Sequence, residues 1–297
     1  MLIANSMNLC FSRFDERELL PRMAAAGYDG VDFNFWDLVR RVNWHDDAEA
    51  DRWLDALAQS TADAGLTWVQ GHGPVFDIFQ NAAEDIFQRD LCAPALRACA
   101  RLGVPWLVLH PCTAAGAFDR AHLNMLLETN RDFVRTLLPL CERYGVGLAL
   151  ENIFDRPWAA PEGAPRFFGA IPDELAALID AIAHPLVGAC WDTGHANVMH
   201  LDQRAALTAM GTRVKVLHLH DNNGQHDEHH LPFIPRPHGV DWDGVMAGLR
   251  AGGYTGALTF EVRAAFEAVP LSLFDDALRY SVQLGRQLAQ TFETAAV

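Results

Sequence analysis

Several features that define special classes of protein are missing from this sequence. There is no apolar run of roughly 18 residues, the length that a membrane-spanning helix needs, so we expect no membrane association. The N-terminal segment has no basic stretch followed by a long apolar run, which predicts no signal peptide and a cytoplasmic location. None of the six cysteines forms a C-x-x-C pair, which indicates reduced, buried thiols. Cys112, which follows His110 and Pro111, is the alternative candidate, as a nucleophile.

Positive charge is also scarce. The chain has 23 Lys and Arg against 38 Asp and Glu, a formal net charge of −15 at pH 7, which argues against a surface that grips a phosphate backbone. The remaining composition, 50% hydrophobic and 21% charged, is typical of a globular protein. Its 297 residues allow two ordinary domains or one large α/β barrel of about 250 residues.

Short, continuous apolar runs recur along the whole chain, a pattern typical of parallel strands that are buried on both faces. The eight runs span residues 2–9, 30–35, 67–72, 106–110, 147–151, 187–192, 214–220 and 257–262. Helical segments lie between them, and several end at a glycine; they span residues 15–26, 49–64, 86–102, 123–144, 172–182, 202–211, 243–251 and 272–289. This alternation predicts a single-domain (β/α)8 TIM barrel over residues 1–297. A doubly wound open sheet is the alternative, but the glycine-rich phosphate loop that it would place after its first strand is absent.

Six consecutive runs, from the third to the eighth, end in or contain residue types that bind metals or transfer protons. They supply His72, His110, Glu151, Asp192 with His195 three residues on, His218 with His220, and Glu261. In a barrel the carboxyl ends of the strands meet at one mouth, where catalytic groups lie. Taken singly, each residue could simply form a hydrogen bond or an ion pair. Several carboxylates buried together are costly unless a cation joins them, which favours a divalent metal site.

These motifs, in this order and spacing, resemble the xylose-isomerase-like barrel superfamily of sugar isomerases and epimerases, which also includes the endonuclease IV type of apurinic endonuclease. The resemblance covers essentially the whole chain. It rests on H-G-P at 72, H-P at 110, L-E-N at 150–152, D-T-G-H-A-N at 192–197, H-L-x-D at 218–221, D-x-H at 227–229 and F-E-V at 260–262.

The resemblance implies one divalent metal ion per chain, held by Glu151, Asp192, His218 and Glu261. The H-L-x-D motif favours His218 over His220 as the ligand, and it leaves His220 at a variable position, where we expect a neighbouring structural or substrate-binding role. Three carboxylates and one imidazole favour Mn²⁺, with Mg²⁺, Co²⁺ or Zn²⁺ as alternatives.

The endonuclease branch of the superfamily carries further metal ligands, and equivalents of these are present: His72, His110, His195, Asp227 and His229. The residues would therefore permit a three-zinc phosphodiesterase. The acidic charge argues against a nucleic-acid substrate. Some sugar-acting members use such histidines to hold substrate hydroxyls, and on this basis we expect His72, His110 and His229 to bind substrate.

The expected reaction is isomerisation or epimerisation of a ketose or keto-polyol through an enediolate, by an enzyme that forms a homodimer or homotetramer. Glu151 and Glu261 would act as paired acid/base groups, and His195 would hydrogen-bond the substrate oxygen that gains charge. Because an enediolate can also expel a β-hydroxyl, a keto-cyclitol or keto-acid dehydratase is the alternative. Trp36 and Phe76 could each stack on the apolar face of a sugar, or each could instead belong to the core.

Two further features bear on the substrate. Arg263 could bind a carboxylate or phosphate of the substrate, or form an ion pair with Glu151 or Asp32. The segment at 232–241 departs from the P-G-x-G sequence of many relatives and has a single glycine, Gly239. The contribution of this segment to the pocket, through Arg236 and His238, is left open.

Overall fold

The computed structural model describes residues 1–7, 13–116, 119–155, 167–233 and 237–295, and its eight strands form one parallel sheet. The strands are β1 (Ile3–Ser6), β2 (Gly30–Asn34), β3 (Thr67–His72), β4 (Trp106–Leu109), β5 (Gly147–Glu151), β6 (Val187–Asp192), β7 (Val214–His218) and β8 (Leu258–Phe260). Each strand pairs in parallel with its neighbours in the order β7-β6-β5-β4-β3-β2-β1-β8. A parallel bridge between Leu219 and Phe260 joins β7 to β8 and closes the sheet. The (β/α)8 barrel expected from the sequence is confirmed.

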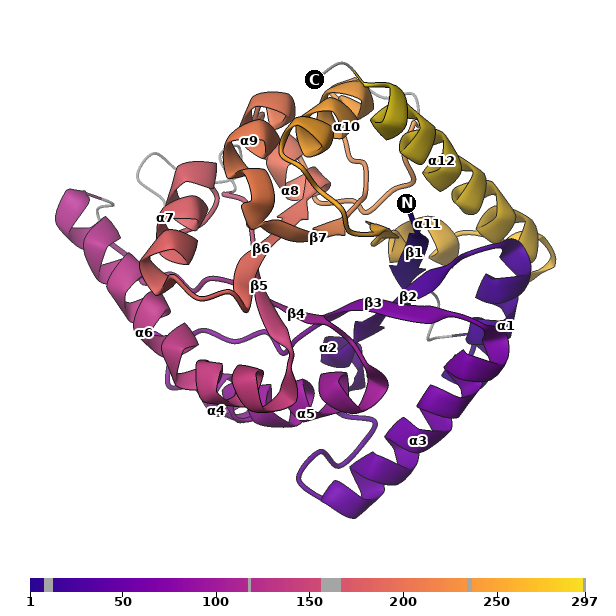
Figure 1. The fold of residues 1–297 in the computed structure, drawn as a ribbon, viewed down its shortest axis with the longest axis horizontal. Coiled ribbons are helices and arrows are strands. Elements are labelled where there is room, and N and C mark those ends of the chain that lie inside the picture. Colours follow the sequence, from indigo (N-terminus) through magenta and orange to yellow (C-terminus); the bar gives the residue numbers. More distant parts are fainter. Residues whose placement is uncertain (8–12, 117–118, 156–166, 234–236, 296–297) are drawn as a thin grey trace.

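The long helices surround the strands, as Figure 1 shows. They are α1 (Glu16–Ala26), α3 (Asp47–Ala64), α4 (Ala83–Asp90), α5 (Cys92–Leu102), α6 (Arg120–Tyr144), α7 (Pro172–Ile182), α9 (Gln203–Met210), α10 (Trp242–Ala251) and α12 (Phe274–Thr294). Glycines end several of them as expected: Gly103 and Gly145, for example, adopt φ of 77° and 66° directly after α5 and α6.

One expected helix is wrong. The sequence pattern predicted a single helix over residues 86–102, but the structure has α4 and α5 in its place, with Leu91 between them at φ −82° and ψ −4°. Pro94 explains the break, because proline has no N–H to donate to the carbonyl four residues earlier and its ring collides with that carbonyl.

Three short helices, none of which the sequence pattern predicted, lie just after strands at the barrel mouth. They are α2 (Phe35–Leu38) after β2, α8 (Thr193–Val198) after β6 and α11 (Arg263–Glu267) beyond the end of β8. Two 3₁₀ turns, Gly211–Arg213 and Leu271–Leu273, precede β7 and α12.

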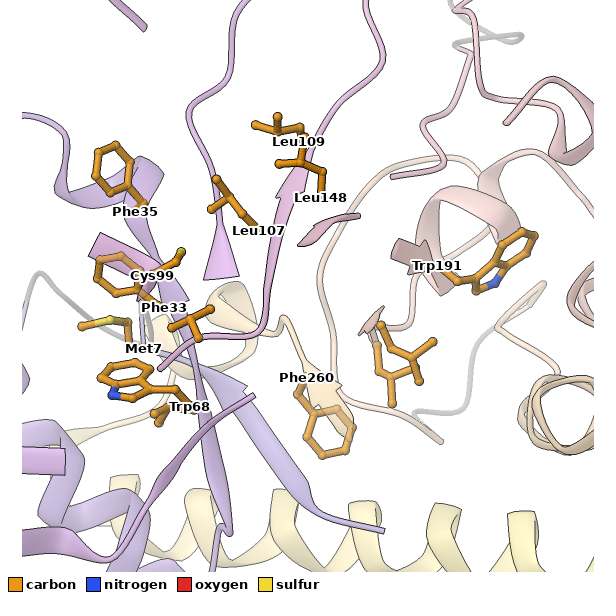
Figure 2. Packing of buried hydrophobic residues seen from close by; sticks show 14 of the residues in the cluster. Met7, Phe33, Phe35, Trp68, Cys99, Leu107, Leu109, Leu148, Trp191 and Phe260 are labelled. Atoms are coloured by element: carbon orange, nitrogen blue, oxygen red, sulfur yellow. The ribbon is translucent and has the colours of Figure 1, made fainter. Parts of the chain in front are cut away.

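The core has two layers separated by the strands. The barrel interior contains a cluster of small apolar side chains from Val108, Ala149, Cys190 and Val216. The larger layer lies between strands and helices; Figure 2 shows Phe33 and Trp68 in it, with ring centroids 5.8 Å apart. Because side chains alternate along a strand, residues two positions after Ala149, Cys190 and Val216 also face inward. Those residues are Glu151, Asp192 and His218.

Within the described ranges, no helix has both the length and the apolar character needed to cross a bilayer. The five cysteines in these ranges are free and buried, as expected from the sequence. Cys10 lies outside the described residues.

Candidate functional site

The four predicted metal ligands meet at the mouth of the barrel. Glu151, Asp192 and His218 are the last residues of β5, β6 and β7, and Glu261 follows β8 directly. The Nδ1 atom of His218 lies 3.2 Å from Glu151 Oε1 and 3.4 Å from Glu261 Oε2. Donor atoms of Asp192, His218 and Glu261 all lie within 4.8 Å of one another. This geometry can hold one divalent cation.

Three further histidines face the Glu151 carboxylate. Oε2 lies 3.3 Å from His110 Nε2 and 3.8 Å from His72 Nε2, and Oε1 lies 3.4 Å from His195 Nδ1. Burial alone would raise the pKa of Glu151, but positive charge on His218 and His110 outweighs it and holds this pKa well below its ordinary value. The carboxylate is therefore ionised whenever its neighbours are protonated or a cation is bound.

Asn152 positions Asp192 and His195, although the sequence pattern did not assign it this role. Its side chain accepts a hydrogen bond from the Asp192 backbone N–H (2.7 Å) and donates one to the Asp192 carbonyl (2.9 Å). The Asp192 carboxylate in turn accepts a hydrogen bond from the His195 backbone N–H at 2.6 Å, at the start of α8. The L-E-N motif contained the signal, since its asparagine follows Glu151 directly.

Backbone carbonyls fix the orientation of three histidines. Nδ1 of His72 lies 2.9 Å from the carbonyl oxygen of the next residue, Nδ1 of His195 lies 2.8 Å from that of Asn152, and Nδ1 of His229 lies 2.8 Å from that of Glu261. Because a carbonyl can only accept, Nδ1 carries the proton in each ring. Nε2 is then the nitrogen that can bind a metal or a substrate.

Three histidine side chains surround the carboxylate of Asp227. Its carboxylate lies 3.0 Å from His229 Nε2, 3.6 Å from His195 Nε2 and 3.5 Å from His220 Nε2. Burial lowers the pKa of His195 and His229, but the facing carboxylates outweigh it. The pKa of His195 is raised well above its ordinary value and that of His229 to about 9. The same contacts hold the pKa of Asp227 below its ordinary value.

His220 lies between the two groups and is fully buried. Its Nε2 is 3.0 Å from the Asp192 carboxylate, and its ring stacks on that of His229 with centroids 3.9 Å apart and planes 8° apart. Gly194 leaves the space for this ring, because a Cβ there would lie 1.9 Å from His220 Cε1. His220 is thus built into the site through its contacts with Asp192 and His229.

Trp36 and Arg263 lie on one side of the mouth, where they line a hollow of about 210 Å³ together with His229 and Glu261. Arg263 does not form the ion pair with Glu151 or Asp32 that the sequence left open. Its guanidinium instead lies 3.3 Å from Asp37 and 2.7 Å from Glu267, because α11 turns it away from the barrel interior.

A larger cavity of about 360 Å³ opens beside His110, His195 and Asp227. Its apolar wall includes Phe76, which also packs against the core, and two phenylalanines for which the sequence offered no signal, Phe154 and Phe167.

Cys112 also lines this cavity, but burial raises the pKa of its thiol to about 12. A thiol with that pKa is a poor nucleophile near neutral pH, which disfavours the cysteine alternative.

Asp221 holds the C-terminal end of the segment at 232–241 by hydrogen bonds. The Asp221 carboxylate accepts hydrogen bonds from the Val240 backbone N–H and the Trp242 indole N–H, both at 3.0 Å. His238 is exposed and does not line the hollows described above. Arg236 lies outside the described residues.

Comparison with known proteins places the chain in a family. A family model described as xylose isomerase-like TIM barrel matches residues 20–282. A probable endonuclease 4 from Methanoculleus marisnigri is 28% identical over 184 residues, which are 57% of this chain and 61% of that protein. The chain spans about half of the length of the curated relatives that it matches, from 48% to 61%.

Among solved structures, a D-psicose 3-epimerase determined in the presence of D-fructose superposes with a TM-score of 0.74 at 15% identity, covering 97% of this chain and 99% of that one. The IOLI protein with a binding zinc atom gives a TM-score of 0.72 at 17% identity, covering 100% and 99%. At these identities the structural matches bear on the fold. The family match over residues 20–282 establishes that the chain belongs to the xylose isomerase-like TIM barrel family.

Proposed function

We propose that the protein is a divalent-metal-dependent sugar isomerase or epimerase that acts on a ketose or related keto-polyol. The observation that carries this proposal is the placement of His218 Nδ1 between the carboxylates of Glu151 (3.2 Å) and Glu261 (3.4 Å), with Asp192 in the same group. The family membership and the structural match to a D-psicose 3-epimerase support it.

The donor set fits a divalent cation. Among the described residues, Glu151 Oε2 and both ring nitrogens of His218 are buried without a hydrogen-bond partner. Buried polar atoms of this kind are costly unless something binds them. A cation held by His218 Nδ1 and the carboxylates would bind one of these nitrogens and offset the repulsion among the three carboxylates. The oxygen-rich set favours Mn²⁺, with Mg²⁺, Co²⁺ and Zn²⁺ as alternatives, at one ion per chain. When bound, such an ion supplies Lewis-acid polarisation of neighbouring substrate oxygens.

The protein's own residues would move the proton. Glu151 and Glu261 approach the site from β5 and the end of β8, so they can face a bound substrate from two sides. One carboxylate would take the proton next to the substrate carbonyl and the other would return one to the enediolate, which gives epimerisation. His195 would donate a hydrogen bond from Nε2 to the substrate oxygen that gains charge, since its raised pKa keeps that nitrogen protonated.

The surrounding residues would bind the remainder of the substrate. His72, His110 and His229 present their Nε2 atoms to the site and can hold hydroxyl groups. Trp36 is exposed and lies beside His72, with ring centroids 6.2 Å apart, where it could stack on a sugar. Arg263 lies nearby, so a polar end of the substrate would lie on that side. The partner is a small molecule rather than a nucleic acid or a membrane, and a homodimer or homotetramer stays a prediction.

Solvent deuterium exchange tests the proposal. The Mn²⁺-loaded protein should incorporate deuterium next to the carbonyl of at least one ketose in a panel. Glu151→Gln should lower the rate by at least about 100-fold, the usual contribution of an acid/base group. If no ketose, keto-polyol or keto-acid exchanges, the mechanism is wrong. Exchange that ends in loss of a β-hydroxyl would instead identify the dehydratase alternative.

A second candidate, an endonuclease IV-like zinc phosphodiesterase, is favoured by one observation. Besides the four-residue set, the donors His72, His110 and Glu151 lie within 4.8 Å of one another, as do those of His220, Asp227 and His229. These groups could hold additional ions. Metal analysis and an abasic-site cleavage assay distinguish the two candidates: three bound zinc ions with strand cleavage would replace the isomerase proposal, and one ion without cleavage would support it.

A further inference from the structure

Asp32 is a buried carboxylate that the proposed reaction does not use. It lies in β2, it is 1% exposed, and its Oδ1 atom has no hydrogen-bond partner among the described residues. The sequence left Arg263 open as its partner, but Arg263 pairs elsewhere. An ionised carboxylate at this depth is costly unless a positively charged or hydrogen-bonding group compensates it.

Gln70 holds Asp32 in place from the neighbouring strand and also reaches across the barrel. Its amide nitrogen donates to Asp32 Oδ2 at 2.9 Å and to the Leu217 carbonyl at 3.0 Å, and its amide oxygen accepts from the Leu217 N–H at 3.4 Å. Gln70 belongs to β3 and Leu217 to β7, which lie four strands apart in the sheet order. The amide therefore joins opposite walls of the barrel and orients the Asp32 carboxylate.

The group that Asp32 faces is His218, the residue after Leu217. Asp32 Oδ2 lies 3.7 Å from His218 Nε2, whereas His218 Nδ1 faces Glu151 and Glu261. The 3.7 Å contact is an ion-pair distance, longer than a hydrogen bond. If Nδ1 binds a cation, the ring proton must be on Nε2, the nitrogen that points to Asp32.

We propose that Asp32, oriented by Gln70, is a positioning residue that holds His218 in the tautomer and orientation that present Nδ1 to the bound cation. Histidines that bind metals commonly donate their other N–H to a carboxylate, and loss of that partner weakens metal binding. The inference rests on the proposed function, because it takes His218 as a ligand. It explains why a buried carboxylate with one unpartnered oxygen is retained inside the barrel.

Direct metal binding tests this role without an activity assay. Chelator-treated wild type, Asp32→Asn and Gln70→Leu are titrated with Co²⁺ by calorimetry, and the visible absorption of the Co²⁺ complex is recorded. We expect Asp32→Asn to bind Co²⁺ 10- to 100-fold more weakly, with an altered spectrum. Gln70→Leu keeps the carboxylate but removes its anchor, so it should show a smaller loss in the same direction.

Asp221→Asn is the matched control. Asp221 is also a buried carboxylate, but it accepts its hydrogen bonds from Val240 and Trp242 rather than facing a predicted ligand. This variant should lose stability and keep Co²⁺ affinity within about twofold of wild type.

The outcomes separate the two proposals. If wild type binds no divalent ion, the proposed function fails and this inference fails with it. If wild type binds Co²⁺ and both Asp32→Asn and Gln70→Leu bind it equally well, only the role of Asp32 is refuted. Gln70→Leu decides the question if Asp32→Asn does not fold.

Discussion

The histidines of the mouth make the stability of the metal-free protein depend on pH in a defined direction. Burial lowers the pKa of His229, but the hydrogen bond to Asp227 and the charge of Glu261 outweigh it and raise this pKa to about 9. In the unfolded chain a histidine titrates near pH 6.5. A raised folded-state pKa gives stability that is fully present below about pH 6.5 and is lost as the pH rises through about 9. At 1.36 kcal/mol per pKa unit, this shift corresponds to about 3 kcal/mol.

Urea unfolding of chelator-treated protein between pH 6 and pH 9.5 measures this contribution of His229 to the free energy of unfolding. Wild type should lose stability across the window, since His195 and His218 have pKa values shifted in the same direction. His229→Gln should lose less unfolding free energy over the same pH range. Its loss should be smaller than that of wild type by about 3 kcal/mol. Two results would refute the reasoning: a metal-free wild type that gains stability as the pH rises, or a His229→Gln variant whose stability falls as steeply as that of wild type.

A saturating divalent ion should counteract the loss of stability that the metal-free protein shows as the pH rises. Histidine ligands must lose a proton before they bind a metal, so the stabilisation produced by the ion should increase with pH over the same window. Repeating the unfolding series with Mn²⁺ and with Mg²⁺ measures this increase.

Three further substitutions test other parts of the site. Glu261→Gln should lower the rate of deuterium exchange by at least about 100-fold in the metal-loaded protein, and a smaller effect would mean that this residue does not transfer the proton. Gly194→Ala places a Cβ 1.9 Å from His220 Cε1, so it should cost at least about 1–3 kcal/mol of unfolding free energy. Unchanged stability would show that His220 moves freely. Phe154→Ala removes part of the larger cavity wall and should raise KM about tenfold with little change in kcat. A fall in kcat alone would argue against a binding role.

The strands and the long helices could be predicted from the sequence because their signals are local. Continuous apolar runs indicated strands buried on both faces, and the glycines after α5 and α6 indicated where those helices end. The break at Leu91 was missed because the apolar spacing continues through it. Pro94 gave the local reason for the break, but its effect depends on whether the residues around it are helical.

The short helices α2, α8 and α11 could not be predicted in this way, since four to six residues are too few to show a periodic pattern. These helices carry Trp36, His195 and Arg263, so the sequence proposed these side chains without fixing their directions. The partners of Arg263 show the consequence. Its charge suggested a pair with Glu151 or Asp32, but the turn into α11 directs it to Asp37 and Glu267.

The sequence by itself determined that Glu151 and Asp192 end their strands and that His218 and His220 lie at the end of the seventh run, so that these side chains share one mouth. The structure ends β7 at His218. Parallel strands with a two-residue side-chain period leave no other placement once the barrel closes. Only the tertiary structure decided which atoms face one another: His220 against Asp192, three histidines around Asp227, and Asp32 beneath His218. Those contacts join strands that are far apart in the chain, and they depend on side-chain orientations that no local pattern encodes.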